Sequence, residues 1–198
     1  MEHFLRVSAL AVGAYLLGSI PFAILITRWR AEIDVRNIGS GHATATNTMR
    51  AAGWASGIAV ALLDALKGFL AVWMAGRFAV FGWEPTIAAA LVVVGHCWPV
   101  YAGFRGGMGV ASGGGTLLAT WPLGLVLAIG LGAACQLLIK HSARGNALTG
   151  LLIGPLWFVF GASGDEILLV VVVGLVLAYR ARIDWQREYR ELWWDRES

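Results

Sequence analysis

The chain alternates between long uncharged stretches and short polar segments, a pattern typical of proteins that cross a membrane several times. The first stretch, residues 7–27, contains no charged side chain and has the length of one helical crossing. Four more stretches have a similar character, and they cover residues 54–76, 86–103, 147–164 and 167–179. The last of these is short, so we expect its helix either to tilt little or to continue into the tail.

The longest uncharged stretch, residues 108–139, is too long for a single crossing. As a continuous helix it would extend over roughly 48 Å, whereas the hydrocarbon core of a bilayer is ~30 Å thick. Pro122 follows Trp121 inside this stretch and interrupts a regular helix, because proline lacks the backbone N–H group. We therefore predict a short crossing before Trp121 and a full crossing after Pro122.

The basic residues favour seven crossings over six. With seven, Arg6 and Arg77 lie on one side of the membrane, and all other basic residues outside the apolar stretches lie on the opposite side. With six, the residues from Lys140 onward change sides and the asymmetry becomes much weaker. Because basic loops are retained in the cytoplasm, we predict seven transmembrane helices with the N-terminus outside and the C-terminus in the cytoplasm.

The composition supports this fold class, an all-α integral membrane protein with residues 1–198 as a single transmembrane helical domain. Hydrophobic residues make up 58% of the chain and charged residues 14%, whereas soluble domains carry about 25% charged residues. The 26 glycines fit close packing of helices in a bilayer. The net charge is only +3 and no basic tract suits nucleic acid. No spacing of His, Cys and carboxylate residues suggests a metal site.

Two glycine-rich polar segments lie between the apolar stretches, and we call residues 37–50 loop one and residues 95–115 loop two. Glycines expose backbone N–H groups, and Arg50 and Arg105 add fixed positive charge. This combination favours binding of a phosphate or another anion, and the predicted topology places both loops in the cytoplasm.

Each loop also has a purely structural interpretation. Loop one contains donors such as Ser40 and Asn47, but a solvated loop in which Asn47 or Thr48 caps the next helix would have the same composition. In loop two, Gly106 and Gly107 follow Arg105, and a re-entrant turn would need such glycines for steric reasons alone.

Three ionisable residues interrupt the apolar stretches. His96 lies near the end of one stretch, where it is either a hydrogen-bonded structural residue or an acid or base that works near neutral pH. Asp64 and Lys67 are three residues apart and therefore share one face of a helix. We interpret them as a structural ion pair in the interior of the helix bundle, in preference to a catalytic pair.

The polar segments resemble the acyl-phosphate-dependent glycerol-3-phosphate acyltransferases of bacteria, the PlsY family. The similarity runs in family order from about residue 10 to residue 115. The matching motifs are Gly18-Ser-Ile-Pro-Phe22, Asn37-Ile-Gly-Ser-Gly41, Ala45-Thr-Asn47 with Arg50, Leu63-Asp-Ala-Leu-Lys-Gly68, Gly95-His96 with Pro99, Phe104-Arg-Gly-Gly107 and Gly109-Val-Ala111.

The resemblance implies a seven-helix enzyme of the bacterial plasma membrane that moves a fatty acyl group from acyl phosphate to the 1-hydroxyl of glycerol 3-phosphate. The product would be lysophosphatidic acid, an early intermediate of phospholipid synthesis, and no metal or cofactor would be needed. Matching the motifs assigns catalytic roles to Ser40 and His96. It also assigns substrate phosphate binding to Asn47, Arg50, Arg105, Gly106 and Gly107. The base would be His96 or a phosphate oxygen of the substrate.

Several positions depart from the family pattern. His42 replaces an asparagine, Thr44 replaces a glycine, and Met108 stands where the family usually has a lysine. The tail segment 179–183 lacks the family's usual His and Asn. Three functions are therefore consistent with the sequence: the family reaction, the same chemistry with another acceptor, or a non-catalytic lipid-binding protein.

Overall fold

The computed structural model describes residues 1–187, and every regular element in that range is helical. The arginines at positions 190 and 196, which the topology prediction placed in the cytoplasm, lie outside the described residues. Two single-turn 3-10 helices, η1 and η2, lie in the loops. The elements are α1 (Glu2–Gly18), α2 (Phe22–Ala31), η1 (Val35–Asn37), α3 (Ala45–Ala52), α4 (Trp54–Phe78), α5 (Glu84–Cys97), η2 (Val100–Ala102), α6 (Val110–Thr120), α7 (Pro122–Ile139), α8 (Ser142–Val159) and α9 (Gly164–Arg182).

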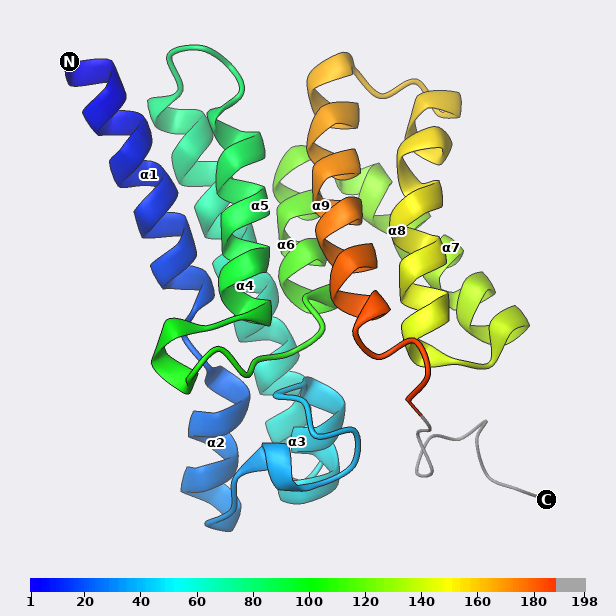
Figure 1. Cartoon of the computed structure of the whole chain (residues 1–198). Coiled ribbons are helices and arrows are strands. Elements are labelled where there is room, and N and C mark those ends of the chain that lie inside the picture. Colours follow the sequence, from blue (N-terminus) through cyan, green and yellow to red (C-terminus); the bar gives the residue numbers. More distant parts are fainter. Residues whose placement is uncertain (188–198) are drawn as a thin grey trace.

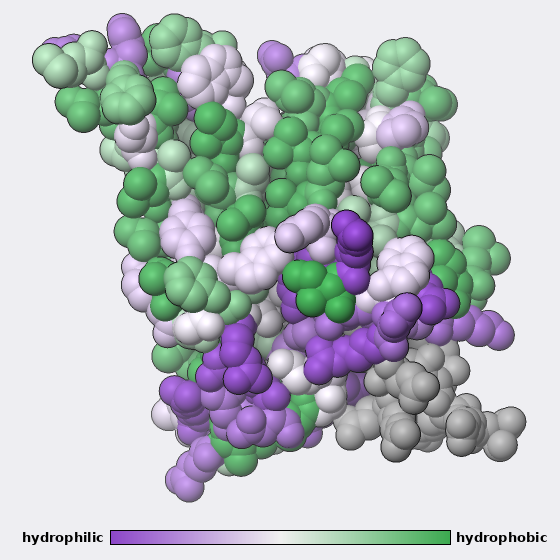
Figure 2. Space-filling model, viewed as in Figure 1, coloured by the Kyte–Doolittle hydropathy of each residue, from purple (hydrophilic) through white to green (hydrophobic). Residues whose placement is uncertain are grey.

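The other seven α-helices form an upright bundle, and the short helices α2 and α3 project from its lower end (Figure 1). Loop one and the segment after α9 lie at this lower end, whereas the N-terminus and the α4–α5 and α8–α9 connections lie at the upper end. Hydrophilic residues gather over the lower end, and hydrophobic residues cover most of the upper body (Figure 2). The surface therefore has an apolar body for the bilayer and a polar end that contains loop one.

The first apolar stretch, which we predicted as one crossing, forms two helices within the single candidate span Glu2–Ala31. The chain leaves α1 at Gly18 and begins α2 at Phe22. Pro21 lacks a backbone N–H group and so cannot continue the α1 hydrogen-bond pattern. The break leaves the carbonyl of Ile20 without a helical partner, and the Lys67 ammonium donates to it over 3.0 Å.

The break at Trp121 is confirmed, because α6 ends at Thr120 and α7 begins at Pro122. With 11 residues, α6 is roughly 16 Å long, about half of a ~30 Å hydrocarbon core. Figure 1 shows α6 ending below the upper end of α9 before α7 descends. The two helices thus return the chain to the lower end, as the predicted topology requires.

The remaining boundaries differ from the predicted ones by a few residues. The third apolar stretch ends early, since α5 stops at Cys97 and is followed by a 3-10 turn. The last stretch continues at both ends into α9, where Ser163 and Glu166 form a capping box. Within residues 1–187, four segments are long and apolar enough to cross a membrane, namely Glu2–Ala31, Trp54–Phe78, Glu84–Ala102 and Pro122–Ile139. The count of seven crossings stays a prediction.

Glycines allow the helices to approach closely. At the crossing of α8 and α9, Gly150 and Gly174 face each other, and a Cβ on either would collide with the carbonyl of the other. A Cβ on Gly115 of α6 would likewise collide with the carbonyl of Ala65 on α4. Such contacts replace the hydrophobic effect as the source of helix association in lipid, and they hold α4 and α6 beside the site described next.

Candidate active site

A cavity of about 350 Å³ opens between loop one, α4, α5, α6 and α8. Four of the predicted site residues line it: Ser40, Asn47, Arg50 and His96. Asp64, which we predicted as part of a structural pair, also lines it. Residues that are far apart in the sequence, from Ser40 to His96, thus contribute polar groups to a single cavity.

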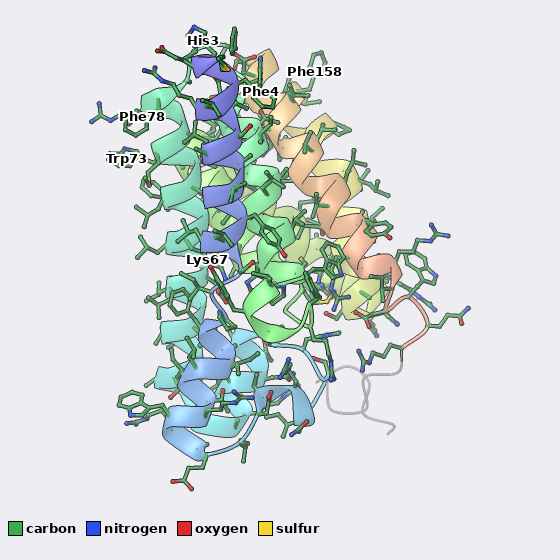
Figure 3. All side chains as sticks on the ribbon, turned by 60° about the vertical axis from the view of Figure 1, so that its left-hand side comes forward. His3, Phe4, Lys67, Trp73, Phe78 and Phe158 are labelled. Atoms are coloured by element: carbon green, nitrogen blue, oxygen red, sulfur yellow. The ribbon has the colours of Figure 1, made fainter. Side chains whose placement is uncertain are left out.

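A larger cavity, of about 810 Å³, lies elsewhere, between α1 and α4. Its lining is mainly apolar and includes Arg6 and Arg77, but none of the predicted site residues. Trp73 and Phe78 of α4 point away from the bundle on this side (Figure 3). We therefore assign the chemistry to the smaller cavity, where the polar groups converge.

Loop one is held in shape by its own side chains. Thr44 is the N-cap of α3, and its hydroxyl accepts a hydrogen bond from the Asn47 backbone N–H over 3.3 Å. The cap is therefore not Asn47 or Thr48, as the structural interpretation of the sequence had it, because α3 begins before them. A β-hydroxyl at position 44 satisfies an N–H group that would otherwise have no partner at the helix start.

The amide of Asn47 organises the polar groups of loop one. Its Nδ2 donates to Ser40 Oγ over 3.0 Å and to the carbonyls of Ile38 and His42 over 3.2 and 3.0 Å. Its Oδ1 accepts from the Arg50 guanidinium over 3.0 Å. Asn47 is almost completely buried, so this amide fixes Ser40 and Arg50 relative to each other at the wall of the cavity.

Asp34 attaches the start of loop one to loop two. Its carboxylate accepts from Arg28 and Arg36 over 2.9 and 2.8 Å, and Arg36 also donates to the carbonyl of Ala102 over 2.9 Å. The hydrogen bonds from Arg36, with Arg28 beside it, hold the pKa of the Asp34 carboxyl well below its usual range. The carboxylate stays ionised, and the link between the two loops persists across the physiological pH range.

Asp64 connects the intramembrane pair to the cavity. Its Oδ1 lies 2.8 Å from the Lys67 ammonium, so the two residues form the predicted ion pair, and both are 2% exposed. The same oxygen lies 3.4 Å from Nδ1 of His96. Figure 3 shows Lys67 at the level where α1 gives way to α2, consistent with its bond to Ile20. The ion pair therefore places a carboxylate beside the His96 imidazole in addition to linking the helices of the bundle.

The backbone N–H groups of Gly106 and Gly107 in loop two form tertiary hydrogen bonds. The Gly106 N–H donates to the carbonyl of Cys97 and the Gly107 N–H to the carbonyl of His96, over 3.2 and 3.1 Å. A Cβ on Gly107 would collide with the His96 imidazole. Arg105 is exposed and does not line the cavity. Of the residues predicted to bind phosphate, Asn47 and Arg50 lie at the cavity, whereas Arg105, Gly106 and Gly107 lie beside it.

Two further residues at the cavity come from α8, Ser142 and Asn146. Neither residue was selected from the sequence, although Asn146 belongs to a short polar segment after the fifth predicted crossing. Met108 also lines the cavity, so the side chain that replaces the family's usual lysine does face this space. Within residues 1–187, no three His, Cys, Asp or Glu side chains are grouped so that they could hold a metal ion.

Comparison with known proteins identifies the family. Residues 8–191 match the family model described as glycerol-3-phosphate acyltransferase. A glycerol-3-phosphate acyltransferase of Halalkalibacterium halodurans is 37% identical over 184 residues, which cover 90% of this chain and 89% of the relative. One of Gluconobacter oxydans is 44% identical over 152 residues, covering 74% and 70%.

Solved structures give the same result. The crystal structure of the integral membrane glycerol 3-phosphate acyltransferase PlsY (YgiH) in its glycerol 3-phosphate form superimposes with a TM-score of 0.80. It is 32% identical and covers 92% of this chain and 91% of its own. Its lysophosphatidic acid form superimposes with a TM-score of 0.78. The predicted all-helical integral membrane fold is thereby confirmed, and the chain belongs to the glycerol-3-phosphate acyltransferase family.

Proposed function

We propose that this protein transfers a fatty acyl group from an acyl phosphate to the 1-hydroxyl of glycerol 3-phosphate and releases lysophosphatidic acid and inorganic phosphate. The observation that carries the proposal is the cavity in which Ser40, Asn47 and Arg50 of loop one face His96 of α5. Membership of the family supports the acceptor, and the resemblance of the motifs supports the donor.

Loop one would bind the substrate phosphate. Arg50 supplies a guanidinium whose orientation is fixed by Asn47, and Ser40 supplies a hydroxyl beside it. Charge-assisted hydrogen bonds to phosphate are short and strong, especially from a preorganised guanidinium. Arg105 would add positive charge near the cavity, and in this proposal Gly106 and Gly107 would position His96 while their own amides stay engaged.

The reaction needs one proton transfer and one bond exchange. The glycerol hydroxyl oxygen attacks the acyl carbonyl carbon, the bond from that carbon to the phosphate oxygen breaks, and inorganic phosphate leaves. We assign acceptance of the hydroxyl proton to His96, which Asp64 orients through Nδ1. A phosphate oxygen of the donor is the alternative acceptor. Because the acyl group is already activated, alignment of the two substrates would supply much of the rate.

The membrane supplies the setting for this reaction. The donor and the product carry acyl chains, so a cavity near the polar end of an apolar bundle lets their headgroups bind while their chains stay in lipid. The relatives are bacterial, and within residues 1–187 most basic residues outside the predicted spans lie on segments at the end that contains loop one. We therefore place the protein in the bacterial plasma membrane with both loops in the cytoplasm.

One observation favours a second candidate, the same chemistry with a less charged acceptor. Met108 contributes an apolar side chain to the cavity wall where the family usually has a lysine. A phosphate dianion would then meet one cation fewer. A non-catalytic lipid-binding role has no such observation in its favour.

Purified protein supplied with palmitoyl phosphate, with and without glycerol 3-phosphate, tests the proposal. We expect phosphate release that depends on glycerol 3-phosphate, and its loss in Ser40→Ala. Release that depends only on another alcohol would support the second candidate. No release with any acceptor would contradict both, provided that the protein is folded by its thermal unfolding profile.

A further inference from the structure

His42 of loop one is joined to the segment after α9. His42 is 7% exposed and Asp184 is 5% exposed, and Nε2 of the imidazole lies 2.9 Å from Oδ2 of the carboxylate. Arg180 and Arg187 complete the group, with guanidinium nitrogens 3.1 Å from Nδ1 and Nε2 of His42 respectively. We call these four residues the His42 cluster.

A neutral imidazole has one donor and one acceptor nitrogen, and two of the three contacts of the His42 ring fit one arrangement of protons. Arg180 has only donors, so Nδ1 accepts from it, and Nε2 then donates to Asp184. Arg187 also has only donors, so in this arrangement it donates to Asp184 and not to Nε2. The Asp184 carboxylate also accepts from Arg180 over 2.8 Å and from Arg187 over 3.0 Å. Although burial raises the pKa of Asp184, His42 and Arg180 outweigh it and hold this pKa well below its usual range.

The cluster also reaches loop two. Nε of Arg180 donates to the carbonyl of Gly107 over 3.2 Å, and the Gly107 N–H donates to the carbonyl of His96. Arg180 is 6% exposed. One buried guanidinium therefore connects loop one, loop two and the chain that follows α9.

The backbone carbonyl of His42 links this residue to the polar groups at the cavity. The carbonyl of His42 accepts from Nδ2 of Asn47, which also contacts Ser40, while Oδ1 of Asn47 holds Arg50. His42 also lines the cavity. If the imidazole lost its partners, this carbonyl would be free to move, and the orientation of the Asn47 amide would no longer be fixed.

We propose that His42 is a positioning residue, which fastens loop one to Arg180 and Asp184 so that Ser40, Asn47 and Arg50 are preorganised for glycerol 3-phosphate. This inference rests on the proposed function. It gives the departure at position 42 a purpose, because the imidazole that replaces an asparagine contacts Arg180 and Asp184. Both ring nitrogens of His42 are engaged, so a positioning role fits better than proton transfer.

The test compares His42→Ala, His42→Gln and Asp184→Asn with the parent protein, and His3→Ala at the opposite end serves as the control. We expect His42→Ala and Asp184→Asn to raise KM for glycerol 3-phosphate on the order of 10-fold, the size of one lost charge-assisted hydrogen bond. The value of kcat should change much less. His42→Gln, which keeps an N–H donor, should recover part of the loss. The double variant that combines His42→Ala with Asp184→Asn should have a KM for glycerol 3-phosphate no higher than that of the more affected single variant.

Hydrogen exchange supplies a readout that does not depend on activity. Backbone amides of residues 38–47 should exchange faster in His42→Ala than in the parent protein, and His3→Ala should leave them unchanged. Unchanged exchange together with unchanged KM would overturn the inference, as would a loss confined to kcat. If the parent protein makes no lysophosphatidic acid, the proposed function is wrong, and the exchange measurement alone decides whether His42 holds the loop.

Discussion

Among the described residues, Arg50 is the one arginine that lines the cavity, and Asn47 orients its guanidinium. We expect Arg50→Ala to raise KM for glycerol 3-phosphate by about 10- to 100-fold, since a charge-assisted hydrogen bond contributes roughly 1.5–3 kcal/mol. Steady-state kinetics measure this effect. Arg30→Ala is the matched control, because Arg30 is exposed at the end of α2, beside Trp29. Equal KM values for the two variants would remove Arg50 from the phosphate site.

His96 is tested separately from phosphate binding. General base catalysis typically contributes about 10²- to 10⁴-fold, so His96→Gln should lower kcat by about 100-fold or more with a smaller change in KM. His3→Gln, at the upper end of the bundle, should have no effect. If His96→Gln retains most of kcat, the proton goes to a phosphate oxygen of the donor and His96 has only a structural role.

Met108 distinguishes the two acceptor classes. In a site that binds glycerol 3-phosphate, Met108→Lys should lower KM for that acceptor, because a phosphate dianion gains from each added positive charge in a partly dehydrated cavity. In a site adapted to a less charged acceptor, the lysine should raise KM, because an unmatched cation must be desolvated. The direction of the change in KM, measured with both acceptors, reports the class. No change with either would mean that Met108 does not face the substrate.

At the scale of an element, α4 carries a buried ion pair through the apolar part of the bundle. Removing one partner leaves an uncompensated charge, which should lower the free energy of unfolding by roughly 3–5 kcal/mol. We therefore expect Asp64→Leu and Lys67→Met to be strongly destabilising in detergent unfolding experiments, and the double variant to be milder than the sum. An additive double variant would show that the charges do not compensate each other.

The sequence predicts helix boundaries well where one local rule applies, and less well where the surrounding structure determines them. The break at Trp121 follows from the length of the run and from Pro122, and the structure has it there. Pro21 carries the same signal inside residues 7–27, but that run has the length of one crossing, so nothing in its length required a break. The role of Thr44 as the cap of α3 depends on where loop one ends, which local composition does not fix.

The same limit applies to the candidate site. Ser40, Asn47, Arg50 and His96 could be selected because polar side chains between apolar stretches are unusual. The link from Asp64 to His96 could not, because it joins α4 to α5 and depends on the angle at which they pack. The amides of Gly106 and Gly107 looked available in the sequence, but tertiary hydrogen bonds to Cys97 and His96 occupy them.

At the scale of the whole molecule, we predict seven crossings with both loops in the cytoplasm. Cysteine labelling in intact cells tests this after the buried Cys97 and Cys135 are replaced. A reagent that does not cross the membrane should label Asp165→Cys, which is exposed at the start of α9, and miss Arg30→Cys at the end of α2. The reverse pattern would exclude the seven-crossing topology.

Part of the overall arrangement was predictable, because the basic residues indicate which helix ends lie on the same side of the membrane. The start of α1, which carries Arg6, and the end of α4, which carries Arg77, lie at the upper end, whereas loop one with Arg50 lies at the lower end (Figure 1). The cavity was not predictable in this way, because its wall includes Ser142 and Asn146 from α8, which the fold brings to loop one.

The transfer of an acyl group to glycerol 3-phosphate can be followed directly with labelled substrates. The most direct measurement uses palmitoyl phosphate with a deuterated chain and glycerol 3-phosphate labelled with ¹³C, both supplied to the protein in lipid vesicles. Mass spectrometry should detect lysophosphatidic acid that carries both labels, and Arg50→Ala should form it more slowly at low acceptor concentration. Intact donor and acceptor after prolonged incubation with folded wild-type protein would contradict acyl transfer to glycerol 3-phosphate by this protein.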